Sequence, residues 1–192
     1  MDDYMCEEYE SILKEWFKII NCELFDGCLK PIRIVVEPEF FFFNTGAFGQ
    51  YCIPKEGEPF LRFNLQGLID MRTGWIEGML SDYIEPSFEE VEEEVKEIIA
   101  GSLIHEMIHQ YSRENGIKDA EVIDGIDIHY DVFKKIAEEK GLLVLPAFNG
   151  DSNTHIRPNH PVLDKLQFED FIEPYYPIEF IVDEWSKWNG DD

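Results

Sequence analysis

The stretch Ile98-Ile-Ala-Gly-Ser-Leu-Ile-His-Glu-Met-Ile-His-Gln-Tyr111 decides the fold of this 192-residue chain. Its apolar residues recur at helical spacing, which predicts a helix packed into the core. His105 and His109 are four residues apart, so both imidazoles lie on one face of that helix, a turn apart. Two histidines and a glutamate, Glu106, are costly on a core helix unless something coordinates them.

The segment His105-Glu106-Met-Ile-His109 matches the HExxH motif of zinc hydrolases. In that motif the two histidines bind the metal, and the glutamate carboxylate acts on a water molecule. Catalytic zinc usually has three protein ligands, so a third must come from elsewhere in the chain. We therefore expect one Zn²⁺ per chain, held in part by these two histidines, with Glu106 as the general base.

The third ligand is expected after the motif, and His129 is the favoured candidate. A helix is predicted at about 127–140, and a ligand on a second rigid helix defines a site better than one on a loop. The metzincin arrangement is excluded because Ser112 and Asn115 stand where it requires glycine and histidine. The alternatives are two further histidines and three carboxylates: His155, His160, Glu121, Asp124 and Asp127.

The part of the chain before the motif predicts helical and β elements. Amphipathic periodicity predicts an N-terminal helix over residues 4–25, and β-branched residues predict a short strand over 31–36. Two further strands, at 46–53 and 60–65, form a small antiparallel hairpin with a proline- and glycine-containing turn. The motif helix itself is expected to begin at a capping box at Ser87 and to end near Gly116. These elements predict an α+β fold.

The part of the chain after the motif predicts a loop over 117–126, the third-ligand helix and then a short strand at 142–145. Residues 146–192 are rich in proline and aromatic residues and are expected to form an extended or partly helical appendage. The sequence thus predicts a catalytic domain over 1–145 and a C-terminal appendage over 146–192 packed on the same domain.

The charge of the chain is strongly negative: 41 acidic and 16 basic residues give a formal net charge of −25. This makes direct DNA binding doubtful and disfavours adhesion to an anionic membrane, because both depend on basic patches. No apolar run of about 18 residues is present, so we expect no membrane span. The acidic start lacks the features of a signal peptide, and the four cysteines show no paired spacing, so we expect a cytoplasmic protein with reduced thiols.

Several short segments occur together in a characteristic order over about residues 4–145. They are Asn21-Cys-Glu-Leu-Phe25, Leu29-Lys-Pro31, Gly46-Ala-Phe-Gly49, Phe60-Leu-Arg-Phe63, Leu103-Ile-His-Glu-Met-Ile-His-Gln-Tyr111 and the pair His129 and Phe133. In this set the chain resembles the SprT-like family of zinc metallopeptidases. HExxH is the specific motif, and the order and spacing of the others support it.

The resemblance implies a zincin-like metallopeptidase domain acting on a protein or peptide substrate. It implies His105, His109 and His129 as the metal ligands and Glu106 as the catalytic base. The expected reaction is hydrolysis of a peptide bond by a zinc-bound water.

Two questions stay open from the sequence. Tyr111 and Tyr130 are both candidates to stabilise the oxyanion or contact the substrate, and the sequence does not choose between them. The alternative functions are a non-catalytic or autoinhibited zinc-binding interaction protein and a hydrolase of a non-peptide amide. An appendage lying over the active site would produce the autoinhibited form.

Overall fold

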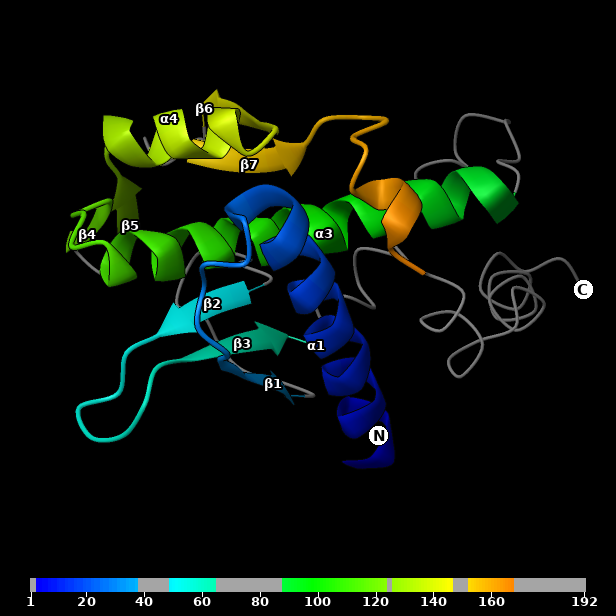
Figure 1. The fold of residues 1–192 in the computed structure, drawn as a ribbon, viewed down its shortest axis with the longest axis horizontal. Coiled ribbons are helices and arrows are strands. Elements are labelled where there is room, and N and C mark those ends of the chain that lie inside the picture. The colour runs from blue at the N-terminus through cyan, green and yellow to red at the C-terminus, as the bar shows by residue number, and fades with distance from the viewer. Residues whose placement is uncertain (1–2, 38–48, 65–87, 124–125, 147–151, 168–192) are drawn as a thin grey trace, which may run out of the picture.

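A computed structural model shows an α+β protein, which confirms the predicted class. The structure describes residues 3–37, 49–64, 88–123, 126–146 and 152–167. Within these residues, helices and small sheets pack around one long central helix (Figure 1). Ser87, where the capping box was expected, lies outside the described residues.

The central helix is α3 (Phe88–Glu114), and it contains the motif. Its core positions are apolar at helical spacing, as predicted. The helix ends in a Schellman turn, in which Gly116 adopts a φ of 68°. There, the Gly116 N–H donates to the Arg113 carbonyl at 3.1 Å, and the Ile117 N–H donates to the Ser112 carbonyl at 2.8 Å. The buried apolar residues along it are Ile99, Ala100, Leu103, Ile104, Met107 and Ile108.

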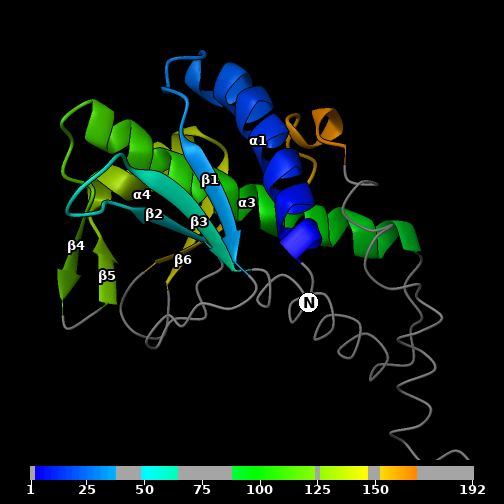
Figure 2. The ribbon, with the colours of Figure 1, turned by 90° about the horizontal axis from the view of Figure 1, so that it is seen from below.

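The predicted N-terminal helix is confirmed as α1 (Asp3–Phe25), which lies beside the first strand and contacts α3 (Figure 2). It ends because Asp26 and Gly27 both adopt positive φ angles, of 54° and 66°. The side chain of Asn21 then ties down the following loop: its amide accepts from the Leu29 N–H at 3.1 Å and donates to the Leu29 carbonyl at 3.0 Å. The buried face of α1 comprises Tyr9, Leu13, Trp16, Phe17 and Ile20.

The predicted hairpin is confirmed as β2 (Gly49–Cys52) and β3 (Phe60–Asn64), which pair antiparallel. The connecting turn contains Gly57 at a φ of 102°, a conformation that L side chains rarely adopt. Strand β2 lies at one end of the strand order β1-β3-β2 and contacts α3. The sheet therefore approaches the motif helix through β2.

The predicted strand over 31–36 is confirmed as β1 (Arg33–Glu37), but it pairs parallel with β3, so the small sheet is mixed and not wholly antiparallel. In the parallel register Ile34 lies opposite Leu61, and Val36 opposite Phe63. All four side chains are buried, so the pairing gathers them on the inner face of the sheet. Local turn chemistry predicts a hairpin, whereas this pairing depends on burial between segments that are distant in the sequence.

The predicted start of the third-ligand helix was also wrong. Residues 117–129 contain a second hairpin, β4 (Ala120–Ile123) and β5 (Ile126–His129), and α4 begins only at Asp131 (Asp131–Glu139). His129 is therefore the last residue of a strand and not part of a helix. The sequence held a signal for this, because apolar and polar residues alternate on both sides of Asp124-Gly125, a dipeptide typical of hairpin turns.

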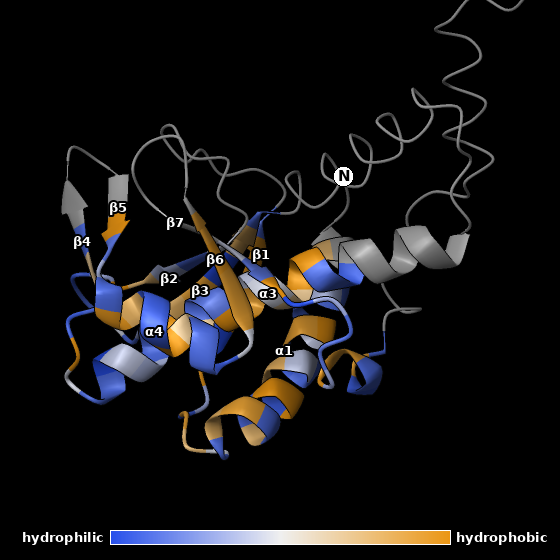
Figure 3. Cartoon of the chain, turned by 90° about the horizontal axis from the view of Figure 1, so that it is seen from above, coloured by the Kyte–Doolittle hydropathy of each residue, from blue (hydrophilic) through white to orange (hydrophobic). Residues whose placement is uncertain are grey.

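The predicted strand after α4 is confirmed as β6 (Leu142–Pro146), which pairs antiparallel with β7 (Ser152–Ile156). Figure 3 shows the apolar character of β6, and β7 packs on α3. A short 3₁₀ helix, η1 (Leu163–Lys165), follows, and Trp16 Nε1 donates to the carbonyl of Gln167 at 3.0 Å. Residues 152–167 therefore contribute to the same core, whereas residues 168–192 lie outside the described part. The core side chains that residues 152–167 contribute are Ile156, Val162, Leu163 and Leu166.

Two general expectations can be compared with the fold. All four cysteines lie in the described residues, and none of them forms a disulfide. In the part of the chain that the structure describes, no helix is long and apolar enough to cross a membrane.

Candidate metal centre

The structure brings His105, His109 and His129 together. The first two project from α3, and the third comes from the end of β5. Nε2 of His109 lies 3.2 Å from Nε2 of His105 and 3.2 Å from Nε2 of His129. Among the described residues, this is the group of side chains that could hold a metal ion.

The spacing of these nitrogens fits a single ion. Zinc–nitrogen bonds of about 2.0–2.1 Å in tetrahedral geometry place neighbouring ligand nitrogens about 3.3–3.4 Å apart. The observed Nε2 separations of 3.2 Å are close to that value. His129 is thus brought to the position of a third ligand, although it lies at the end of strand β5 and not on the predicted helix.

Hydrogen bonds on the far side of two rings orient their Nε2 atoms. Nδ1 of His109 lies 2.8 Å from Oδ2 of Asp119, and Nδ1 of His105 lies 2.8 Å from Oγ1 of Thr154. A carboxylate only accepts, so we assign the proton of His109 to Nδ1, which leaves the Nε2 lone pair facing the other histidines. Metal-binding histidines in proteins are typically held in this way.

The electrostatics of the group favour a neutral imidazole at His105. Burial of its ring lowers the pKa of His105 well below the ordinary value, and the neighbouring His109 and His129 lower it further. For Asp119, burial alone would raise the pKa, but the hydrogen bond with His109, assisted by one with Ser112, outweighs it and the net pKa is lowered. His105 is therefore a neutral nitrogen donor, and the carboxylate of Asp119 behind His109 is ionised.

One aromatic side chain, Phe133, packs against all three histidines. Its ring centroid lies 4.8 Å from that of His105, 4.9 Å from that of His109 and 4.1 Å from that of His129. Phe133 lies on α4 and is fully buried, so it connects this helix to the three rings and limits their rotation.

Glu106 lies next to His105 on α3 and is only 6% exposed. Strand β2 packs closely on it: a Cβ on Gly49 would lie 3.1 Å from Cγ of Glu106 and 2.8 Å from Cε1 of Phe63. Glycine at position 49 therefore allows the edge of the sheet to approach the motif helix. The structure holds this carboxylate between the metal-site helix and β2.

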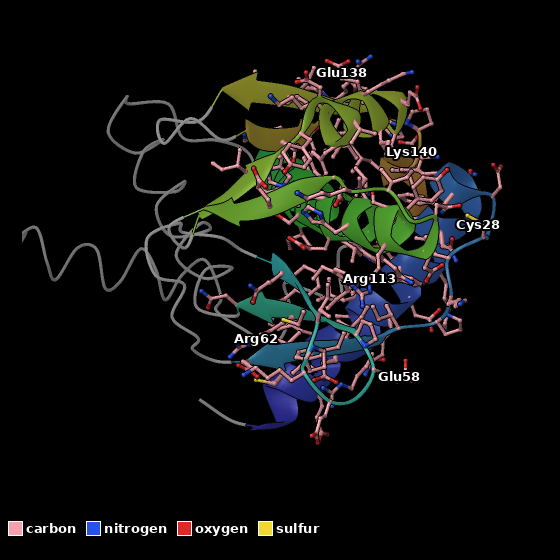
Figure 4. All side chains as sticks on the ribbon, turned by 90° about the vertical axis from the view of Figure 1, so that its left-hand side faces the viewer. Cys28, Glu58, Arg62, Arg113, Glu138 and Lys140 are labelled. Atoms are coloured by element: carbon pink, nitrogen blue, oxygen red, sulfur yellow. The ribbon has the colours of Figure 1, made fainter. Side chains whose placement is uncertain are left out.

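The two candidate tyrosines lie in different places. Tyr111 is directed away from the two motif histidines, because around the α3 axis it lies about 120° from His105 and about 160° from His109. Its ring packs at 5.9 Å from that of Phe25, with Lys140 Nζ 5.7 Å from its centroid. Lys140 extends from the end of α4 toward the end of α1, where it donates to the Leu24 carbonyl (Figure 4). The structure does not bring Tyr111 to the histidines.

Tyr130 directly follows His129, and its N–H donates to the Asp119 carbonyl at 2.8 Å. Lys118 Nζ lies 5.0 Å from the centre of its ring and pairs with Glu121 at 3.2 Å. The hydrogen bond with Tyr130, followed by that with Lys118, lowers the pKa of Glu121. The backbone of Tyr130 thus fastens the β4–β5 hairpin to the start of α4, and its side chain lies against Lys118 and Glu121.

Of the alternative third ligands, the three whose side chains the structure describes are not gathered with the motif histidines. Glu121 is engaged by the ion pair just described, His155 is exposed on β7, and His160 lies against the turn after α4. Asp124 lies outside the described residues, as does the side chain of Asp127.

Two residues of the site, Asp119 and Thr154, were missed by the sequence reasoning. Asp119 is a lone acidic residue in a connecting segment of a chain rich in acidic residues, and Thr154 is 49 residues from its partner His105. Neither belongs to a short motif, so no local signal identified them.

Comparisons with protein-family models, with curated proteins and with solved structures find no match for this chain. The fold and the site define an α+β protein with a three-histidine group that could hold a metal ion. The functional interpretation therefore depends on the geometry of this site.

Proposed function

We propose that the chain is a zinc-dependent metallopeptidase of the SprT-like, zincin-like type. The observation that carries the proposal is the convergence of three Nε2 atoms beside a buried glutamate that follows the first histidine on the same helix. Three imidazole donors, two pairs of them at 3.2 Å, suit zinc better than a hard cation such as magnesium, which prefers oxygen ligands.

The proposed reaction is hydrolysis of a peptide bond. Bound zinc supplies Lewis acidity, which lowers the pKa of water at the site to about 7 and polarises the substrate carbonyl. Glu106 accepts the proton from the attacking water at a carboxylate oxygen and passes it to the leaving nitrogen as the C–N bond breaks. The products are a carboxylate and an amine.

Other residues hold the reacting groups in place. Asp119 and Phe133 fix the orientation of the imidazoles, and β2 packs against the side chain of Glu106. The proposal retains Tyr130 as the candidate donor to the oxyanion, because it adjoins His129 whereas Tyr111 packs on Phe25.

The substrate is proposed to be a protein or peptide of neutral or basic character. The net charge of −25 attracts positively charged chains and repels nucleic acid and acidic polypeptides. Direct DNA binding is therefore not part of the proposal. Cleavage of a peptide library with graded net charge tests this: basic peptides should be cleaved faster at low salt, and the difference should shrink at high salt.

The function is tested by comparing wild type with Glu106→Gln and His129→Ala. Wild type should contain about one zinc per chain by elemental analysis and cleave unfolded protein or peptide substrates. Glu106→Gln should retain zinc but lose about 10²–10⁴-fold in rate, the usual contribution of a general base. His129→Ala should lose most of its zinc. Glu138→Gln, a change on the exposed face of α4, is the matched control (Figure 4).

Each alternative function has its own outcome in this experiment. Glu106→Gln cleaving as fast as wild type would refute the mechanism. Zinc binding without peptide cleavage would favour an interaction protein, or a hydrolase acting on a non-peptide amide, which a panel of small amides distinguishes.

A further inference from the structure

Strand β7 lies along α3 in a matched register. On the helix, Gly101 and His105 are four residues apart, which is about 6 Å of rise. On the strand, Thr154 and Ile156 are two residues apart, which is about 6.6–6.8 Å. These nearly equal steps allow two contacts to form together.

The first contact is close backbone packing. A Cβ on Gly101 would lie 3.1 Å from the backbone nitrogen of Ile156 and 3.8 Å from the carbonyl carbon of His155. The second contact is the hydrogen bond of 2.8 Å between Thr154 Oγ1 and His105 Nδ1. The missing side chain at Gly101 therefore sets the position of β7 on the helix, and this position brings the Thr154 hydroxyl to His105.

The strand alternates as this arrangement requires. Ile156 is buried and Thr154 half-buried on the side that faces α3, whereas His155 between them is exposed. On its other edge β7 is paired with β6, where Val144 lies opposite Thr154. The threonine is thus held by a paired strand rather than by an isolated loop.

We propose that β7 is part of the metal centre and that Thr154 is a positioning residue for His105. Its hydroxyl oxygen accepts the Nδ1–H of His105, which keeps Nε2 unprotonated and directed at the ion. Gly101 acts through the backbone of β7 by setting the register of this contact. The inference relies on the proposed function only in taking the bound ion as zinc.

The hydroxyl has a specific consequence for the histidine. Without an acceptor, the enclosed Nδ1–H would lose its hydrogen bond, and the ring could carry its proton on Nε2 instead, where it blocks metal binding. Changes to groups that hold metal-binding histidines typically weaken metal affinity by about 10–100-fold. The same loss is expected here.

The test measures zinc affinity by competition with a chromophoric chelator in full-length Thr154→Val, Thr154→Ser, Gly101→Ala and His155→Ala proteins. Thr154→Val keeps the shape of the side chain and should weaken zinc binding by about 10–100-fold. Thr154→Ser keeps the hydroxyl and should restore the affinity to near that of wild type. Gly101→Ala should weaken binding because it displaces β7, whereas the exposed neighbour His155→Ala should bind as wild type does.

A second measurement separates positioning from a loss of folding. The ¹⁵N chemical shifts of the histidine rings in the zinc-free protein report which nitrogen carries the proton. Thr154→Val should raise the fraction of His105 protonated on Nε2 while the denaturant midpoint shows that the protein is still folded. Wild-type affinity and an unchanged tautomer in Thr154→Val would overturn the inference.

Failure of the inference and failure of the proposed function give different results. If wild type binds zinc but cleaves nothing, while Thr154→Val binds zinc more weakly, the inference stands and the peptidase function falls. If wild type is an active peptidase and Thr154→Val has unchanged zinc affinity, the function stands and the inference falls. Absence of zinc binding in wild type overturns both.

Discussion

Replacing Asp119 by asparagine should weaken zinc binding without disturbing the fold. The carboxylate lies 2.8 Å from Nδ1 of His109, and the side chains of Asp119 and His109 are only 15% and 16% exposed. Solvent therefore screens this pair little. The backbone carbonyl of Asp119, which binds Tyr130, is unchanged by the substitution.

The size of the effect follows from the hydrogen bond. A bond to a charged group contributes about 1.5–3 kcal/mol, and each 1.4 kcal/mol changes affinity about tenfold. Asp119→Asn retains an oxygen that can accept from His109, so it removes the charge and should weaken zinc binding by about tenfold. Asp119→Ala also removes the acceptor and should reach about 100-fold.

The measurement is the zinc dissociation constant, obtained by competition with a chelator at constant pH and ionic strength. Glu121→Gln is the matched control, because it removes the same charge two residues away, from a side chain that engages Lys118 and Tyr130 and not a histidine. Equal weakening by Glu121→Gln would mean that only the overall charge matters. Wild-type affinity in both Asp119 variants would refute the reasoning.

Three further predictions concern neighbouring residues. Gly49→Ala should destabilise the protein by about 1–3 kcal/mol, because the new Cβ would lie 2.8 Å from the fully buried Phe63 ring. Denaturant unfolding measures the change, with Gln50→Ala as the control, and equal stability of the two variants would contradict the prediction. The zinc-free protein should lose stability as the pH falls below about 6.5, since the lowered pKa of His105 means that the unfolded chain binds more protons there. The loss is up to about 1.4 kcal/mol per pH unit, and it should be smaller in His105→Gln when urea unfolding is compared between pH 7.5 and 5.5. Cys52 should be alkylated by iodoacetamide more slowly than the exposed Cys22 and Cys28, because burial raises the pKa of its thiol to about 11. Arg62 opposes this rise in pKa, and the charge of Glu106 adds to it. Equal alkylation rates in peptide mapping by mass spectrometry would count against the prediction.

The parts of the fold that could be predicted are those with local signals. Periodic apolar residues identified α1 and the motif helix, and Gly116 marked where the latter ends. The His105 and His109 pair follows directly from helical geometry. His129 was identified for the wrong structural reason, since a helix was predicted where β5 forms.

The parts that could not be predicted depend on pairing between distant segments. The parallel pairing of β1 with β3 is stabilised by burying Ile34 and Val36 beside Leu61 and Phe63, and no turn signal reports it. The same holds for β7, whose place along α3 depends on the close approach at Gly101.

The sequence by itself determined the α+β class, the motif helix and two of the three clustered histidines, because each depends on residues within a few turns of one another. Only the tertiary structure decided how the centre is assembled: His129 arrives on a strand, Asp119 binds His109, and Thr154 binds His105. The reason is physical, since a hydrogen bond between residues far apart in the chain forms only after packing brings their elements into register.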